Sequence, residues 1–303
     1  MEQIETQEHT PTGQSCGNDP PKSASSQQVE TAACSTCGGA ASQAGHAPSF
    51  VYALGRIQPR FPNLGAEKEF AQVAARSSTQ ALTDQQTLQA VLSKRENRYL
   101  ARQLCWVLTI EGIETYILRL RDPLDLELLT NAVRPVPRPT DVDVVIGLRG
   151  PIAPPELCNG LLLPIVAVDQ TYSFDVDTLM RAIPRPEKMS AKEFGPAAEE
   201  LFARIQQLAD NAGATDEHRA FNYLAVRYPA IYSKTAEQFA ANSSLSAVEI
   251  RRSALSSTRR IFDIIFSYTG RTTAVTEKFS VRVDVTDEFP FLVRALSPMV
   301  DVL

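Results

Sequence analysis

Residues 275–285 read VTEKFSVRVDV, in which apolar residues occupy nearly every second position and polar residues lie between them. This period of two predicts a β-strand with one buried face. The run from Arg260 to Tyr268 is equally rich in β-forming residues, and Gly270 lies between the two runs. We therefore expect an antiparallel hairpin in the C-terminal part of the chain.

Other strands are expected upstream, where short apolar runs lie between turn residues. Residues 105–111 and 115–120 are expected to pair around Gly112. Residues 142–148 and 161–168 have the pattern of short buried strands.

Helix signals accompany these strands. A capping-box pattern begins at Thr83 and another at Ser190. Thr215 caps a third predicted helix, and Pro229 ends it. Helices and strands mix without a regular β-α alternation, so the predicted class is α+β. It consists of mixed helices and short strands, with a C-terminal substructure of helices followed by a β-meander or hairpin.

The first 47 residues differ from the rest in composition. Lys22 is their only Lys or Arg, and they contain no aromatic residue. Such a segment buries too little apolar surface to offset its chain entropy, so we expect a flexible polar arm over residues 1–47. A Pro-containing stretch divides the remainder into two expected subdomains, residues 48–186 and 187–303.

Charge and hydropathy argue against two classes of protein, nucleic-acid binders and membrane-spanning proteins. The chain has 303 residues and a formal net charge of −5, which argues against a general nucleic-acid binder, because such proteins carry a strongly basic face. No run of about 18 apolar residues occurs, so no membrane span is expected. The polar, acidic start of the chain is unlike a secretory signal, and we expect a cytoplasmic protein.

Cysteines supply a candidate metal site. Cys34 and Cys37 form a C-x-x-C-G knuckle, whose two thiolates could bind one tetrahedral zinc ion. Cys105 and Cys158 would complete four ligands if the fold brings them together, and His46 is an alternative ligand. In a cytoplasmic protein we expect free or metal-bound thiols rather than disulfides. The alternatives are an unliganded pair in the arm and a buried, inert thiol at Cys105.

Carboxylates and arginines supply further candidates. Asp141 and Asp143 flank Val142 and so face one side of a strand, as a metal-binding or acid/base pair would, although a solvated strand entrance explains them too. Several arginines flank predicted strands and fit carboxylates of a peptide or partner, with dispersed solvated arginines as the alternative. These are Arg56, Arg60, Arg251, Arg252, Arg259 and Arg260.

Several long stretches together resemble one family. They are FVYALGRI (50–57), PRFP (59–62), RENRYLARQLCW (95–106), DVDVVIG (141–147), TDEHRA (215–220), NYLAVRYP (222–229) and VRVDVT (281–286). They are similar to the C-terminal domain of unknown function of cyanobactin maturation proteases of the PatA and PatG type. The likeness covers residues 48–303, and the subtilisin-like signatures of the protease domain are missing from this chain.

The resemblance implies an accessory domain in the biosynthesis of ribosomally made, post-translationally modified peptides. Our first hypothesis is a non-catalytic module that holds a precursor peptide or pathway enzymes. The second is a peptide-tailoring enzyme that uses zinc or the pair of Asp141 and Asp143. The third is a zinc-stabilised structural unit that forms a homodimer.

Overall fold

The structure, a computed structural model, describes residues 49–77, 81–138, 141–175, 181, 194–196, 201, 211–254 and 256–299. The chain divides into two units, Met1–Gly45 and His46–Leu303, and all described residues belong to the second unit. The predicted polar arm, the predicted boundary after residue 186 and most of the helix predicted from Ser190 lie outside the described residues, so these remain predictions.

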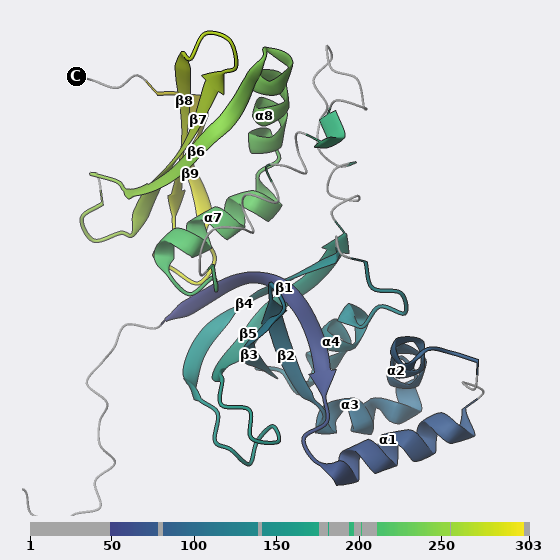
Figure 1. The fold of residues 1–303 in the computed structure, drawn as a ribbon. Coiled ribbons are helices and arrows are strands. Elements are labelled where there is room, and N and C mark those ends of the chain that lie inside the picture. Colours follow the sequence, from purple (N-terminus) through teal and green to yellow (C-terminus); the bar gives the residue numbers. More distant parts are fainter. Residues whose placement is uncertain are drawn as a thin grey trace, which may run out of the picture. The chain divides into compact units, whose positions relative to one another are not determined.

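A closed barrel forms the N-terminal part of the described residues, with the strand order β1-β2-β3-β5-β4. All neighbouring strands are antiparallel except β3 and β5, which are parallel. The strands are β1 (Phe50–Arg60), β2 (Cys105–Ile110), β3 (Ile113–Leu120), β4 (Asp141–Ile152) and β5 (Pro164–Asp175), drawn in purple to teal in Figure 1. All the strands predicted upstream of residue 170 are confirmed, and β4 and β5 are longer than predicted.

Strand β1 is buried on both faces. Val51 and Ala53 belong to the core of the barrel, whereas Tyr52 and Leu54 belong to a second core that includes the C-terminal helices. A strand buried on both sides needs no polar alternation, which explains why residues 50–54 are all apolar.

Two glycines allow the barrel to close. A Cβ atom at Gly55 would lie 2.5 Å from the carbonyl oxygen of Thr109, and one at Gly147 would lie 2.2 Å from that of Ala167. Strand β1 changes its partner from β4 to β2 just after Gly55, and the β4–β5 register shifts at Gly147. Only glycine permits such close approach, so these positions determine where the barrel bends.

Short helices pack beside the barrel. The capping box predicted at Thr83 is confirmed, since its hydroxyl accepts a hydrogen bond from the backbone N–H of Gln86 at 3.3 Å, and the Gln86 side chain accepts one from the N–H of Thr83 at 3.0 Å. The helices are α1 (Leu64–Arg76), α2 (Asp84–Leu92), η1 (Arg95–Asn97), α3 (Arg98–Gln103), η2 (Pro123–Asp125) and α4 (Leu126–Ala132).

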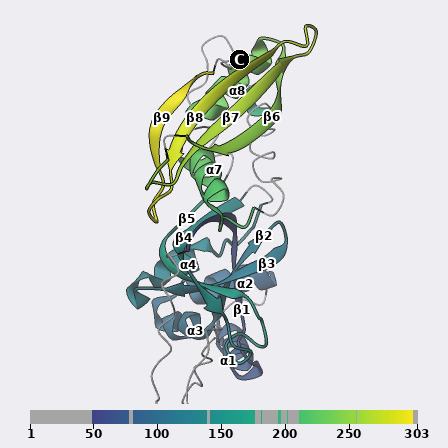
Figure 2. The same ribbon diagram turned by 90° about the vertical axis from the view of Figure 1, so that its left-hand side faces the viewer.

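The C-terminal part of the described chain contains two helices and an open sheet of strand order β6-β7-β8-β9. Figure 2 shows these strands side by side, with β6 and β9 at the two edges. The elements are α7 (Asp216–Arg227), α8 (Ala230–Ala240), β6 (Ser243–Arg252), β7 (Ile261–Gly270), β8 (Thr276–Asp284) and β9 (Phe291–Pro298). The predicted hairpin is β7–β8 and is confirmed, whereas α8, β6 and β9 were not predicted individually.

One face of this sheet packs on α7 and α8. Phe266 and Val281 of the sheet lie in the same core as Phe221 and Leu224 of α7. Because side chains alternate along a strand, the residues between them point to the opposite, outer face. Thr215 caps α7 as predicted and accepts a hydrogen bond from the backbone N–H of His218 at 3.2 Å. The predicted α+β class is confirmed.

None of the helices described is long and apolar enough to cross a membrane.

Candidate functional site

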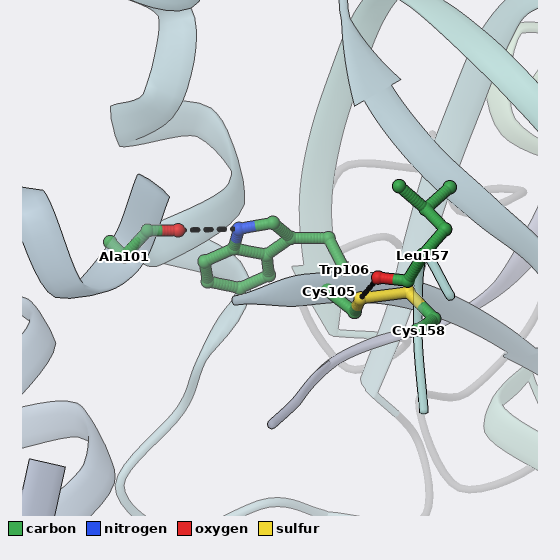
Figure 3. The surroundings of a disulfide bond; sticks show 5 residues. All are labelled: Ala101, Cys105, Trp106, Leu157 and Cys158. Atoms are coloured by element: carbon green, nitrogen blue, oxygen red, sulfur yellow. Dashed lines mark hydrogen bonds between the residues drawn. A yellow bond between two sulfur atoms is a disulfide. The ribbon is translucent and has the colours of Figure 1, made fainter. Parts of the chain in front are cut away.

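The predicted zinc ligands Cys105 and Cys158 form a disulfide. Their sulfur atoms are 1.95 Å apart and their Cα atoms 5.9 Å apart (Figure 3). A disulfide sulfur lacks the thiolate charge that binds zinc, so the prediction that these two residues complete a site with Cys34 and Cys37 is wrong for the oxidised chain. The expectation of reduced thiols is also wrong for this pair. Cys34 and Cys37 lie outside the described residues.

The disulfide ties the β4–β5 loop to the barrel. Cys105 begins β2, and Cys158 lies in the loop between β4 and β5, where the Leu157 carbonyl oxygen is 3.3 Å from the Cys105 sulfur (Figure 3). The neighbouring Trp106 donates its indole N–H to the carbonyl of Ala101 at 3.0 Å, which fixes α3 against the same strand. The cysteines therefore hold a loop in place. In the part of the chain that the structure describes, no group of three or more His, Cys, Asp or Glu side chains could hold a metal ion.

Asp141 and Asp143 both contact Arg134. Both carboxylates are buried at the start of β4, and the Arg134 guanidinium lies 3.1 Å from Asp143 and 3.7 Å from Asp141. Asp143 also accepts a hydrogen bond of 2.7 Å from the backbone N–H of Ile57, just beyond the point where β1 leaves β4. Asp141 accepts one of 2.6 Å from the N–H of Arg138. The pair therefore has a structural role in closing the barrel.

The environment of Asp143 also changes its proton affinity. Burial raises the pKa of the Asp143 carboxyl above its ordinary value, against the opposing effects of hydrogen bonds from Ser173 and Ile57 and the charge of Arg134. Asp141 and Asp143 line a cleft of about 310 Å³. A carboxyl with a raised pKa beside a cleft is an arrangement that general acids use.

The arginines proposed as peptide ligands fall into two groups. Arg56 and Arg60 lie on β1 and line the same 310 Å³ cleft as Asp143. Arg60 lies 2.7 Å from Glu114, and Arg56 donates a hydrogen bond to the carbonyl of Arg138 at 3.1 Å.

The other predicted arginines lie at one end of the β6–β9 sheet. Arg260 is engaged within the fold, because it contacts Asp216 at 3.2 Å and donates to the carbonyl of Thr286 at 2.5 Å. Arg259 lies 2.5 Å from the buried carboxylate of Asp284 and stacks over the ring of Phe291. These two arginines thus organise the end of the sheet.

Arg251 and Arg252 line a cleft of about 430 Å³ on the sheet, together with two arginines that the sequence reasoning missed as site residues. Arg282 of β8 and Arg294 of β9 share this cleft. The period of two in residues 275–285 did place Arg282 on the polar face, but β9 was not predicted, so no local pattern indicated that Arg294 lies beside it.

This combination of barrel, helices and open sheet can be compared with known proteins. The profile of the family described as "PatG Domain" matches residues 50–258. The chain belongs to the PatG domain family.

A solved structure titled "PatG Domain of Unknown Function" is similar to this PatG domain, with a TM-score of 0.69 and 20% sequence identity over 83% of this chain and 98% of that chain. At this level of identity, the likeness shows a shared fold. No curated protein matches the chain. The resemblance drawn from the sequence is therefore confirmed as membership of a PatG-type domain family.

Proposed function

We propose that this PatG domain is a non-catalytic accessory module that holds a precursor peptide or partner enzymes during the biosynthesis of ribosomally made, modified peptides of the cyanobactin type. Family membership supports the link to this kind of pathway. The proposal places the protein in the cytoplasm, where ribosomal precursors are made. Thiols are ordinarily reduced there, so the proposal requires the Cys105–Cys158 disulfide to be an exception to that rule.

The open edge of β9 is the observation that carries this proposal. Strand β9 pairs with β8 on one side, and no strand among the described residues pairs with its other side. An edge strand presents backbone N–H and C=O groups to which an extended peptide can add by main-chain hydrogen bonding. A precursor peptide is extended before it is folded or cyclised, so it matches this mode of binding.

Isothermal titration calorimetry tests the proposal. The full chain is titrated with the precursor peptide of its own pathway and, separately, with the pathway's protease. We expect saturable binding of at least one of them, with a negative heat-capacity change if apolar surface is buried. Absence of a heat change with both, at several temperatures, contradicts the proposal.

A peptide-tailoring enzyme is the second candidate, supported by the raised pKa of Asp143 beside its cleft. This candidate requires that Asp143→Asn abolish product formation in a reconstituted pathway while the chain stays folded. Normal product from a variant carrying both Asp141→Asn and Asp143→Asn eliminates it.

A further inference from the structure

A row of charged residues crosses the outer face of the β6–β9 sheet. The strand register places Arg251 opposite Asp263, Asp263 opposite Arg282, and Arg282 opposite Arg294, so one residue of the row comes from each strand. We call these four residues the arginine row. Three of its members are positive and one is negative, although the chain as a whole has a net charge of −5.

The single carboxylate of the row is already engaged. Arg282 holds Asp263 with two hydrogen bonds of 2.7 and 3.1 Å. Arg251 pairs with Glu249 at 2.6 Å, but both side chains are about half exposed, so this pair contributes little. Among the described residues, Arg294 has no acidic partner. Asp263 neutralises Arg282 but not Arg294, so Arg294 carries the uncompensated positive charge at the β9 end of the row.

An apolar stripe lies next to the arginine row. Phe289, Phe291 and Val293 are 49%, 46% and 41% exposed, and they follow one another at every second position. The register shift between Arg282 and Val283 gives β9 one extra residue, Val293, beside Arg294. Exposed aromatic and branched residues in a contiguous stripe mark interaction surfaces more often than scattered ones do.

Hydrogen bonds from Arg219 fix the segment of chain that leads into the apolar stripe. The guanidinium of Arg219 is fully buried and donates hydrogen bonds to the carbonyls of Val285 at 2.9 Å, Glu288 at 3.2 Å and Asp287. These carbonyls lie between β8 and Phe289. A surface fixed in this way loses little conformational entropy when a partner binds.

We infer that the edge of β9 binds an extended peptide segment in which an acidic residue has apolar residues two positions away on either side, so that all of them share one face of the added strand. The segment adds to the sheet as a strand alongside β9, its carboxylate meets Arg294, and its apolar side chains two positions away contact the apolar stripe. This inference rests on the proposed function, and it specifies the chemistry of the peptide and the place where it binds.

Charge and spacing favour a peptide over a nucleic acid. A cross-strand pair brings Cβ atoms within about 5 Å, which suits one carboxylate at Arg294. Two residues of the apolar stripe, Phe291 and Val293, lie on β9 close to Arg294, and a phosphate backbone offers nothing apolar to contact them. The arginine row is short, about 14 Å across four strands, whereas nucleic-acid binders neutralise many phosphates.

Fluorescence anisotropy tests the inference with a labelled ten-residue peptide of alternating Thr and Val in which the third Val is replaced by Glu, called the Val/Glu peptide. The same peptide with Gln in place of Glu, called the Val/Gln peptide, is the uncharged control. We expect the full-length chain to bind the Val/Glu peptide at least 10-fold more tightly than the Val/Gln peptide. Arg294→Glu should weaken binding of the Val/Glu peptide at least 10-fold. The matched control is Arg102→Glu, which makes the same charge change at an exposed position of α3 and should leave affinity within twofold.

The inference is overturned if Arg294→Glu and Arg102→Glu weaken binding equally, because long-range attraction by the positive charges of the chain then explains the binding. Tighter binding of a ten-nucleotide single strand than of the Val/Glu peptide also overturns it. If the precursor peptide binds the wild type but Arg294→Glu does not weaken that binding, the inference fails while the proposed function stands. If the Val/Glu peptide binds through Arg294 but neither the precursor peptide nor the protease binds, the proposed function fails, while the inference that the β9 edge binds peptides stands.

Discussion

The barrel and the β6–β9 sheet differ in whether their strands have unpaired edges. Every barrel strand pairs on both sides, and the Cys105–Cys158 disulfide ties the β4–β5 loop to the end of the barrel. The sheet ends at β9, which exposes Phe291 and Val293 beside an edge without a strand partner among the described residues. Closure removes edges and an open sheet leaves them available. We therefore expect the barrel to supply most of the stability and the sheet to supply the proposed peptide binding.

Removal of the disulfide should have the largest effect and acts on the barrel alone. Cys105 and Cys158 are separated by 53 positions, and a loop of that length is stabilised by about 4 kcal/mol when it is cross-linked. The variant with both Cys105→Ser and Cys158→Ser should therefore lose about 4 kcal/mol of unfolding free energy in urea titrations. Binding of the Val/Glu peptide at the sheet should be unchanged. Equal midpoints for the variant and the oxidised wild type contradict the assigned role of the disulfide.

Loss of Arg219 should have the next largest effect and acts on the sheet. Arg219→Met leaves the buried carbonyl of Val285 and the partly buried carbonyl of Glu288 without their donor, which should cost about 3 kcal/mol. Hydrogen exchange of residues 285–291 should accelerate, whereas that of the barrel strands should not. Arg251→Met, at an exposed position, is the control and should change stability by less than about 0.5 kcal/mol. Uniform acceleration over barrel and sheet would show that the two regions unfold as one unit.

Glu288 links the sheet to the barrel in a pH-dependent way. Burial, followed by a hydrogen bond with Asp169 of β5 and the charge of that residue, raises the pKa of Glu288 to about 7, while Arg121 lies 2.7 Å from Asp169 and 3.9 Å from Glu288. A carboxyl whose pKa is raised on folding is disfavoured when it ionises, so stability falls as the pH rises from about 4.5 to 7 and then levels off.

Glu288→Gln removes this titration. The unfolding free energy of the variant minus that of the wild type should therefore be larger at pH 8 than at pH 5, by on the order of 2 kcal/mol. Chemical unfolding at both pH values measures the difference. A constant difference between variant and wild type across this range contradicts the raised pKa.

Arg294→Gln should have the smallest effect on stability. Arg294 has no acidic partner among the described residues and faces Arg282 across the strands, so its loss should change unfolding free energy by less than about 0.5 kcal/mol. The same variant should bind the Val/Glu peptide several-fold more weakly. A large loss of stability would mean that Arg294 serves the fold, and the division between stabilising barrel and binding sheet would then be wrong at this residue.

Local sequence patterns predicted much of the fold. The capping box at Thr83, the Thr215 cap and the alternation over residues 275–285 each depend on neighbours within one segment, and the structure confirms them. Barrel closure was not predicted, because it depends on which strands meet at Gly55 and Gly147, and no local pattern encodes that pairing.

The candidate site was harder to predict for the same reason. The C-x-x-C spacing led to the prediction that Cys105 and Cys158 complete a zinc site. They form a disulfide instead, because the β4–β5 loop brings Cys158 next to β2, and a contact between residues 53 positions apart has no local sequence pattern. Asp141 and Asp143 were correctly placed on one strand, whereas no sequence pattern indicated that Arg134 contacts both of them. Arg294 could be found only after β9 was placed next to β8.

Hydrogen–deuterium exchange of the full chain, with and without the Val/Glu peptide, tests the division between barrel and sheet most directly. Added strand pairing slows exchange at the backbone it covers. We predict that the peptide protects β9 and leaves the strands of the barrel unchanged. Protection centred on the barrel, or on the cleft beside Asp143 with β9 unaffected, would contradict the account.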